Sequence, residues 1–172
     1  MKKILLCFLV SASLIACTNQ ETKTEAKTET TGSVTTTGPD VDLIKKSITA
    51  FADGDWATYA STYADTAKSY HNIWPSNTDT TVGVKIPVLI EGFKKQRELM
   101  DGKLTMGGTI FEVVTMPDGS KYGHVWVDFT WKNKKGEVGK SVLFDSYGIN
   151  KDGKISYEWP IYDTKDVVRL GN

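Results

Sequence analysis

From about residue 40 onward, apolar residues recur at helical spacing and then at strand spacing. Leu43, Ile44 and Ile48 fall on one face of a helix that Asp40 can cap. The segment Asp53-Gly54-Asp55 ends this helix, and its second aspartate can cap the next one. The pattern therefore predicts two consecutive helices with a short break between them.

The second helix carries an aromatic stripe in which Trp56, Tyr59 and Tyr63 recur at helical spacing. A strand is predicted over residues 68–74, followed by a loop over 75–81. A third helix is predicted over residues 86–100, with apolar positions along one side. These helices precede a region of different periodicity.

The remainder of the chain predicts a meander of four antiparallel strands. Its turns are Pro117-Asp118-Gly119, Lys134-Lys135-Gly136 and Lys151-Asp152-Gly153. Each ends in a glycine suited to the left-handed position of a three-residue hairpin loop. Because such a loop sets the register of its two strands, it also sets which side chains share a face.

The predicted register gives the sheet two substantially apolar faces. One row of the inner face contains Phe111, Val125, Asp145 and Trp159, and the next row contains Val113, Gly123, Tyr147 and Tyr157. The outer face carries the row Ile110, Trp126, Phe144 and Pro160, with His124 beside Glu112. One face must cover the helices, and the other must meet a partner or water.

The N-terminus begins Met1-Lys2-Lys3 and continues with an apolar run from Ile4 to Ile15, which is typical of a secretory signal. The run ends in Leu14-Ile15-Ala16-Cys17, which resembles the lipobox of bacterial lipoproteins. This resemblance implies cleavage before Cys17 and acylation of that residue, which would anchor the chain in a bilayer.

Three parts of the chain follow from this interpretation. Residues 1–16 are predicted to be a lipoprotein signal peptide, residues 17–39 the acylated Cys and a disordered polar tether, and residues 40–172 one domain. The location predicted is the cell envelope. Because Thr18 stands where inner-membrane lipoproteins of enterobacteria carry Asp, an outer-membrane anchor facing the periplasm is favoured.

Charge and composition exclude several functions. Without Lys2 and Lys3, 19 Lys and Arg face 21 Asp and Glu, so no basic face for nucleic acid is expected. The mature chain would keep Cys17 as its single cysteine, and its two histidines fall on different faces of the predicted domain. Neither a disulfide nor a metal centre is predicted, and no cofactor motif is present.

Three segments resemble the NTF2-like superfamily, and its SnoaL-like branch in particular. They are "ITAFADGDWATYASTY" (48–63), the Gly83-led third helix, and "DGKISYEWPIYD" (152–163). The resemblance implies an α+β cone in which a curved, mostly antiparallel sheet wraps around three helices from the N-terminal half. It also implies an enclosed pocket and dimers formed through the outer sheet face.

Asp145 is the candidate catalytic residue. The resemblance implies an acid or base on the penultimate strand, and the register places Asp145 among apolar neighbours that would raise its pKa. The glutamate that the family often carries two residues after the Ile of "GKI" is replaced here by Tyr157. The candidate ligand-binding residues are Tyr147, Tyr157, Trp159, Phe111, Tyr63, His71 and Trp74.

Three functions remain open at this point. The first is a binding module that holds a small hydrophobic ligand in an aromatic pocket without chemistry. The second is an enzyme of the SnoaL or ketosteroid-isomerase type that uses Asp145 to move a proton. The third is an interaction subunit, most simply a homodimer, formed through Ile110, Trp126, Phe144 and His124.

Overall fold

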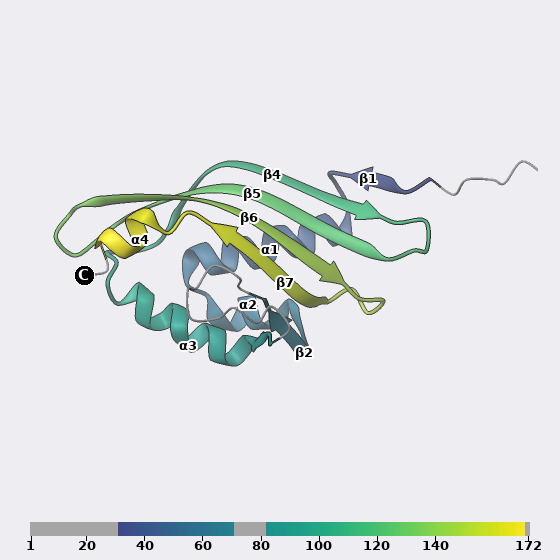
Figure 1. The fold of residues 1–172 in the computed structure, drawn as a ribbon, viewed down its shortest axis with the longest axis horizontal. Helices are drawn as coiled ribbons and strands as arrows, with labels where there is room; N and C mark the ends of the chain where they lie inside the picture. The colour runs from purple at the N-terminus through teal and green to yellow at the C-terminus, as the bar shows by residue number, and fades with distance from the viewer. Residues whose placement is uncertain (1–30, 71–81, 171–172) are drawn as a thin grey trace, which may run out of the picture. The chain divides into compact units, whose positions relative to one another are not determined.

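The computed structural model describes residues 31–70 and 82–170, which contain seven strands and four helices (Figure 1). The strands are β1 (Ser33–Thr35), β2 (Tyr63–Ser69), β3 (Val84–Lys85), β4 (Thr105–Thr115), β5 (Lys121–Lys132), β6 (Val138–Ile149) and β7 (Ile155–Tyr162). The helices are α1 (Pro39–Asp53), α2 (Trp56–Ser61), α3 (Ile86–Arg97) and α4 (Lys165–Leu170).

All seven strands form one sheet in the order β1-β4-β5-β6-β7-β2-β3. Every neighbouring pair is antiparallel except β2 and β7, which are parallel. Figure 1 shows α1, α2 and α3 against one side of the curved sheet, while α4 lies at the end where β7 finishes. The predicted α+β architecture, a mostly antiparallel sheet wrapped around three helices, is confirmed.

The three predicted hairpin turns are present. Gly119, Gly136 and Gly153 have positive φ angles of 84°, 80° and 67°, a conformation that favours glycine. Backbone hydrogen bonds close the loops as expected; for example, the amide of Met116 donates to the carbonyl of Ser120 at 2.8 Å. The predicted alignments of β4 with β5 and of β5 with β6 are confirmed, and Val125 lies between Phe111 and Asp145.

The predicted alignment of β7 is wrong by one residue, because a β-bulge interrupts its pairing with β6. Ile149 pairs with Ile155, but Gly148 pairs with Tyr157, so Ser156 is an extra residue on β7. Beyond the bulge, every side chain of β7 points to the face opposite to the predicted one. The predicted inner positions of Tyr157 and Trp159, and the predicted outer position of Pro160, are therefore wrong.

The first two helices begin and end close to the predicted positions. The α1 helix starts at Pro39 with Gly38 as its N-cap, so Asp40 lies in the first turn and is not the cap. Asp55 does cap α2, since its Oδ1 accepts the amide of Thr58 at 3.0 Å. Tyr63 follows the end of α2 and begins β2, whereas the aromatic stripe had predicted it on the helix.

Other boundaries differ more. The strand predicted over 68–74 is β2, which covers Tyr63–Ser69, and α3 ends at Arg97. Part of the predicted tether forms β1, where Val34 pairs with Val114 at the edge of the sheet. Cys17, the signal peptide, His71 and Trp74 lie outside the described residues.

The core lies between the sheet and α1, and a glycine sets how closely they approach. A Cβ on Gly123 would lie 1.9 Å from Cδ1 of Ile44, so only glycine lets this part of α1 pack onto β5. Ile44 and Val125 are completely buried at this contact. Within residues 31–70 and 82–170, no helix combines the length and apolar character needed to cross a bilayer.

Candidate functional site

A cavity of about 80 Å³ lies on the helix side of the sheet. Its wall is largely apolar and aromatic and includes Ile48, Phe51, Phe93, Leu104, Phe129, Trp131, Leu143, Pro160 and Val167. The wall also contains polar side chains, and among these Asp145 and Glu158 are carboxylic acids and Arg97 is a base. Such a cavity, apolar with a few polar groups, is typical of a small-molecule site.

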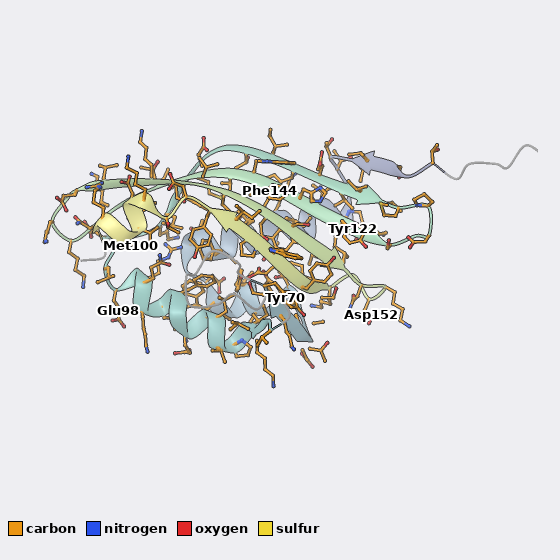
Figure 2. All side chains as sticks on the ribbon, in the orientation of Figure 1. Tyr70, Glu98, Met100, Tyr122, Phe144 and Asp152 are labelled. Atoms are coloured by element: carbon orange, nitrogen blue, oxygen red, sulfur yellow. The ribbon has the colours of Figure 1, made fainter. Side chains whose placement is uncertain are left out.

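Partly exposed residues of the cavity wall lie on α4 and at the end of α3, namely Gln96, Arg97, Met100 and Val167. We infer that the cavity opens on this side. Figure 2 labels Met100 on the side of α3's end that faces α4. Asp145 and its neighbours are buried and form the deep end.

Two carboxyl groups meet at the deep end. Asp145 on β6 and Glu158 on β7 are 3% and 2% exposed. Because Tyr147 pairs with Glu158 across the two strands, Asp145 and Glu158 are diagonal neighbours on the inner face. Burial raises the pKa of Asp145 well above its usual range, and the charge of Glu158 raises it further.

Tyrosine hydroxyls surround Glu158. Tyr59 donates to its Oε2 at 3.1 Å, Tyr63 donates to the same atom, and the two hydroxyls lie 2.9 Å apart. Burial raises the pKa of Glu158, whereas the hydrogen bonds from Tyr63, Ser69 and Tyr59 lower it. Three side-chain hydroxyls therefore favour the ionised form of Glu158.

Asp145 also has hydrogen-bond partners. Bonds from the Tyr147 side chain and from the backbone of Trp159 and Ser146 lower the pKa of Asp145 and only partly oppose burial and the charge of Glu158. Its Oδ1 atom is buried and has no hydrogen-bond partner among the described residues. Leaving such a group unsatisfied costs about 1–3 kcal/mol, so this oxygen stands out among the polar atoms of the cavity wall.

The structure brings together only some of the predicted site residues. Asp145 and Tyr147 line the cavity, and Tyr63 reaches Glu158. Phe111 is on the inner face but outside the cavity wall, with Nζ of Lys45 at 5.8 Å from its ring centre. The predicted positions of His71 and Trp74 lie outside the described residues.

Tyr157 and Trp159 do not line the cavity. Both lie on the outer face, where Tyr70 contacts their rings at centroid distances of 6.4 and 6.3 Å, and Trp159 is 40% exposed. Tyr157 covers Gly148, since a Cβ at that glycine would lie 2.2 Å from the tyrosine ring. The bulge at Ser156 is the cause, since it exchanges the two faces of β7.

Sequence reasoning missed Glu158 and Arg97 as members of the site. A signal for Glu158 was present: the glutamate expected two residues after Ile155 is found three residues after it. One extra residue in the strand restores it to the inner face, and Ser156 is that residue. Arg97 falls four residues after Phe93 on the apolar side of the predicted third helix, and this spacing was the available signal for it.

The outer face of the sheet carries the predicted apolar group. Trp126 and Phe144 pack with their ring centres 4.8 Å apart, and His124 contacts both rings. Nδ1 of His124 lies 3.2 Å from Oε1 of Glu112, which confirms the predicted pair. Ile110 is 59% exposed beside them.

Among the residues that the structure describes, no three His, Cys, Asp or Glu side chains are grouped so that they could hold a metal ion. The polar groups of the cavity instead suit hydrogen bonding and proton exchange, because two acids with raised pKa values face an apolar space.

No family model matches the chain, and no curated protein matches it. Solved structures do match. An NTF2-like protein from Burkholderia xenovorans LB400 superposes with a TM-score of 0.54 at 16% identity, covering 78% of this chain and 96% of that one. The BvnE pinacolase from Penicillium brevicompactum gives 0.59 at 9% identity, with coverage of 77% and 88%.

A ketosteroid isomerase-like protein from Erwinia carotovora atroseptica gives a TM-score of 0.52 at 17% identity, covering 69% of this chain and 89% of that one. At these identities the likeness concerns the fold. The chain has an NTF2-like fold, as the sequence resemblance implied. This fold accommodates different activities, so function must be argued from the cavity itself.

Proposed function

We propose that this domain binds a small, mainly apolar ligand in the cavity and recognises a polar atom of that ligand through Asp145. The observation that carries the proposal is the buried Oδ1 atom of Asp145, which has no partner within residues 31–70 and 82–170 although it belongs to a residue of the cavity wall. A ligand donor or acceptor at this point would recover the free energy lost by burying the carboxyl group.

Binding is tested with a library of small ketones, phenols and carboxylic acids, using two-dimensional NMR of the wild-type domain. A true ligand is expected to shift the methyl signals of Leu104 and Leu143, which line the cavity. Asp145→Asn should weaken such a ligand on the order of 10-fold, the value of one buried hydrogen bond. Asp128→Asn, which changes an exposed carboxyl outside the cavity wall, serves as the matched control.

Acid–base catalysis is the second candidate. Its specific support is the pair of adjacent buried carboxyls. Tyr59 and Tyr63 donate to Glu158, while Oδ1 of Asp145 has no partner among the residues that the structure describes. Burial raises the pKa of Asp145, which makes it a better proton carrier near neutral pH. In this function the ionised form of Asp145 takes a proton from a ligand carbon next to a carbonyl group and returns it at another position.

Deuterium exchange separates the two candidates. Ketone ligands found by NMR are incubated in D₂O with the protein, and exchange of the protons next to the carbonyl is followed. Loss of exchange in Asp145→Asn, with binding retained, supports catalysis. Ligands that bind the wild-type protein without any exchange support the binding module.

The anchor and self-association belong to the same proposal. The lipobox at Cys17 supports attachment to the outer membrane, with the domain facing the periplasm. The exposed side chains of Ile110 and Trp126, beside Phe144 and His124, support a homodimer formed through the outer face.

A further inference from the structure

Arg97 is a cation at the opening of the cavity. It lies in the last turn of α3 and forms part of the cavity wall. Its Nη2 donates to the carbonyl oxygen of Phe51 at 2.5 Å, and its guanidinium carbon lies 5.3 Å from the Phe51 ring centre and 5.9 Å from that of Trp56. The aromatic rings therefore hold the guanidinium in one place.

This cation has no ion-pair partner among the described residues. The carboxylates of Asp40, Asp53, Glu91 and Asp166 are instead paired with lysines or with Arg169. Burial lowers the pKa of Arg97 to about 10, and the charge of Asp53 opposes this only in part. A guanidinium has five N–H donors, and a single hydrogen bond to a carbonyl leaves most of them unused.

The two ends of the cavity differ in charge preference. At the deep end, Asp145 and Glu158 disfavour any further negative charge, since the charge of Glu158 already raises the cost of ionising Asp145. At the opening, Arg97 favours one. A ligand that spans the cavity is therefore oriented with its anionic group outward and a neutral polar group toward Asp145.

We infer that the ligand is an organic carboxylate whose apolar body fills the aromatic cavity and whose carboxylate binds the guanidinium of Arg97. The inference rests on the proposed function and names the class of ligand that this same cavity accepts. A single planar guanidinium matches a carboxylate in charge and geometry, since both N–H donors of its fork can be used at once. The aromatic wall provides the surface for the apolar body.

The test compares two probes that share one apolar body, 3-phenylpropanoate and its neutral primary amide. Dissociation constants are measured by NMR titration for the wild-type protein, for Arg97→Gln and for Lys95→Gln. Lys95 is an exposed cation of the same helix, and its replacement changes the net charge equally. Since both probes bury the same phenyl group, the ratio of their affinities cancels any general change of cavity shape.

The wild-type protein and Lys95→Gln are expected to prefer the carboxylate over the amide by about 10- to 100-fold, as one charge-assisted hydrogen-bonding group provides. In Arg97→Gln this ratio should fall to about 1 while the amide affinity stays unchanged. Equal affinity of the wild-type protein for both probes would overturn the carboxylate inference and leave the binding function intact. Failure of both probes to shift any cavity residue would count against the binding function itself.

Discussion

The two buried carboxyls show how neighbouring residues with equal burial acquire different roles. Glu158 receives hydroxyl donors from Tyr59 and Tyr63, which favour its ionised form. Asp145 keeps one oxygen without a partner in the described part of the chain and experiences the charge of Glu158. When the pair holds one proton, that proton therefore belongs on Asp145.

A pH-dependent stability follows from the raised pKa of Asp145. Between its pKa in the unfolded chain, about 3.9, and its higher pKa in the fold, the native state binds more protons than the unfolded state. The contribution of this group to stability is full below that window and is lost as the pH rises through it, by up to about 1.4 kcal/mol per pH unit. Asp145→Asn should remove this slope.

Urea denaturation of the wild-type protein and of Asp145→Asn at intervals from pH 5 to pH 8 measures the effect. The difference between the two free energies of unfolding should change steadily in favour of the variant as the pH rises. Asp128→Asn, which alters an exposed carboxyl, should follow the wild-type curve. Parallel curves for Asp145→Asn would contradict a raised pKa at this residue.

The tyrosine donors of Glu158 give a second prediction at this scale. Tyr63→Phe removes a hydroxyl that donates to Oε2 of the buried carboxyl. The expected loss is about 1–3 kcal/mol in the free energy of unfolding at neutral pH, because the buried carboxyl is left with fewer donors. Tyr157→Phe, on the outer face, should cost about 0.5 kcal/mol or less. Equal losses in the two variants, measured by urea denaturation, would show that the hydroxyl of Tyr63 contributes nothing specific.

At the scale of elements, the predictions succeeded where local chemistry demands one conformation. Gly119, Gly136 and Gly153 each occupy a positive-φ position of a hairpin loop, and this fixed the alignment of β4 to β6. The bulge at Ser156 has no such requirement, since no glycine or proline marks it. Its position depends on which faces of β7 pack best, and that is a tertiary property.

Tyr63 illustrates the same limit in another way. Its spacing from Tyr59 suits a helix, but α2 ends at Ser61 and Tyr63 stands on β2. Its hydroxyl nevertheless lies 2.9 Å from that of Tyr59, so the pattern identified neighbours in space although it misassigned the element. Asp145 was predicted to be enclosed, and it is buried. Glu158, the second buried carboxyl of the site, was not predicted because the bulge changes the face on which it lies.

Deletion of Ser156 tests the bulge directly. Without the extra residue, Gly148 can still pair with Tyr157 in a regular ladder, so Glu158 stays on the inner face and Trp159 on the outer face. We therefore expect the deletion variant to fold and to unfold cooperatively when followed by circular dichroism. Ser156→Ala removes only its hydrogen bond to the carbonyl of Gly148 and should cost about 1 kcal/mol, and the deletion should cost a similar amount. A deletion variant that fails to fold would contradict the role of Ser156 as an extra residue outside the ladder.

At the scale of the whole molecule, the two faces of the sheet differ in what they contact. The inner face supplies the cavity and its acids, while the outer face leaves Ile110 and Trp126 exposed. Replacing Trp126 with Glu places a charge in the proposed contact between copies, so it should shift a dimer to monomer in sedimentation velocity experiments. Lys95→Glu, an exposed position on α3, should leave the dimer intact. A wild-type chain that stays monomeric at high concentration removes the dimer proposal.

The anchor is the remaining property of the whole molecule, and it depends on one thiol. If Cys17 is acylated, the protein expressed with its N-terminus should partition into the detergent phase of Triton X-114, and mass spectrometry should show a mature chain that starts at Cys17. Cys17→Ser removes the acyl acceptor and should move the protein to the aqueous phase. Cys7→Ser changes the other cysteine of the same segment and should behave as the wild-type protein does. Aqueous partitioning of the wild-type protein would contradict the anchor. The conclusions about the cavity would be unaffected, because its carboxyl pair and tyrosines lie on β6, β7, α2 and β2, in the part of the chain after Thr31.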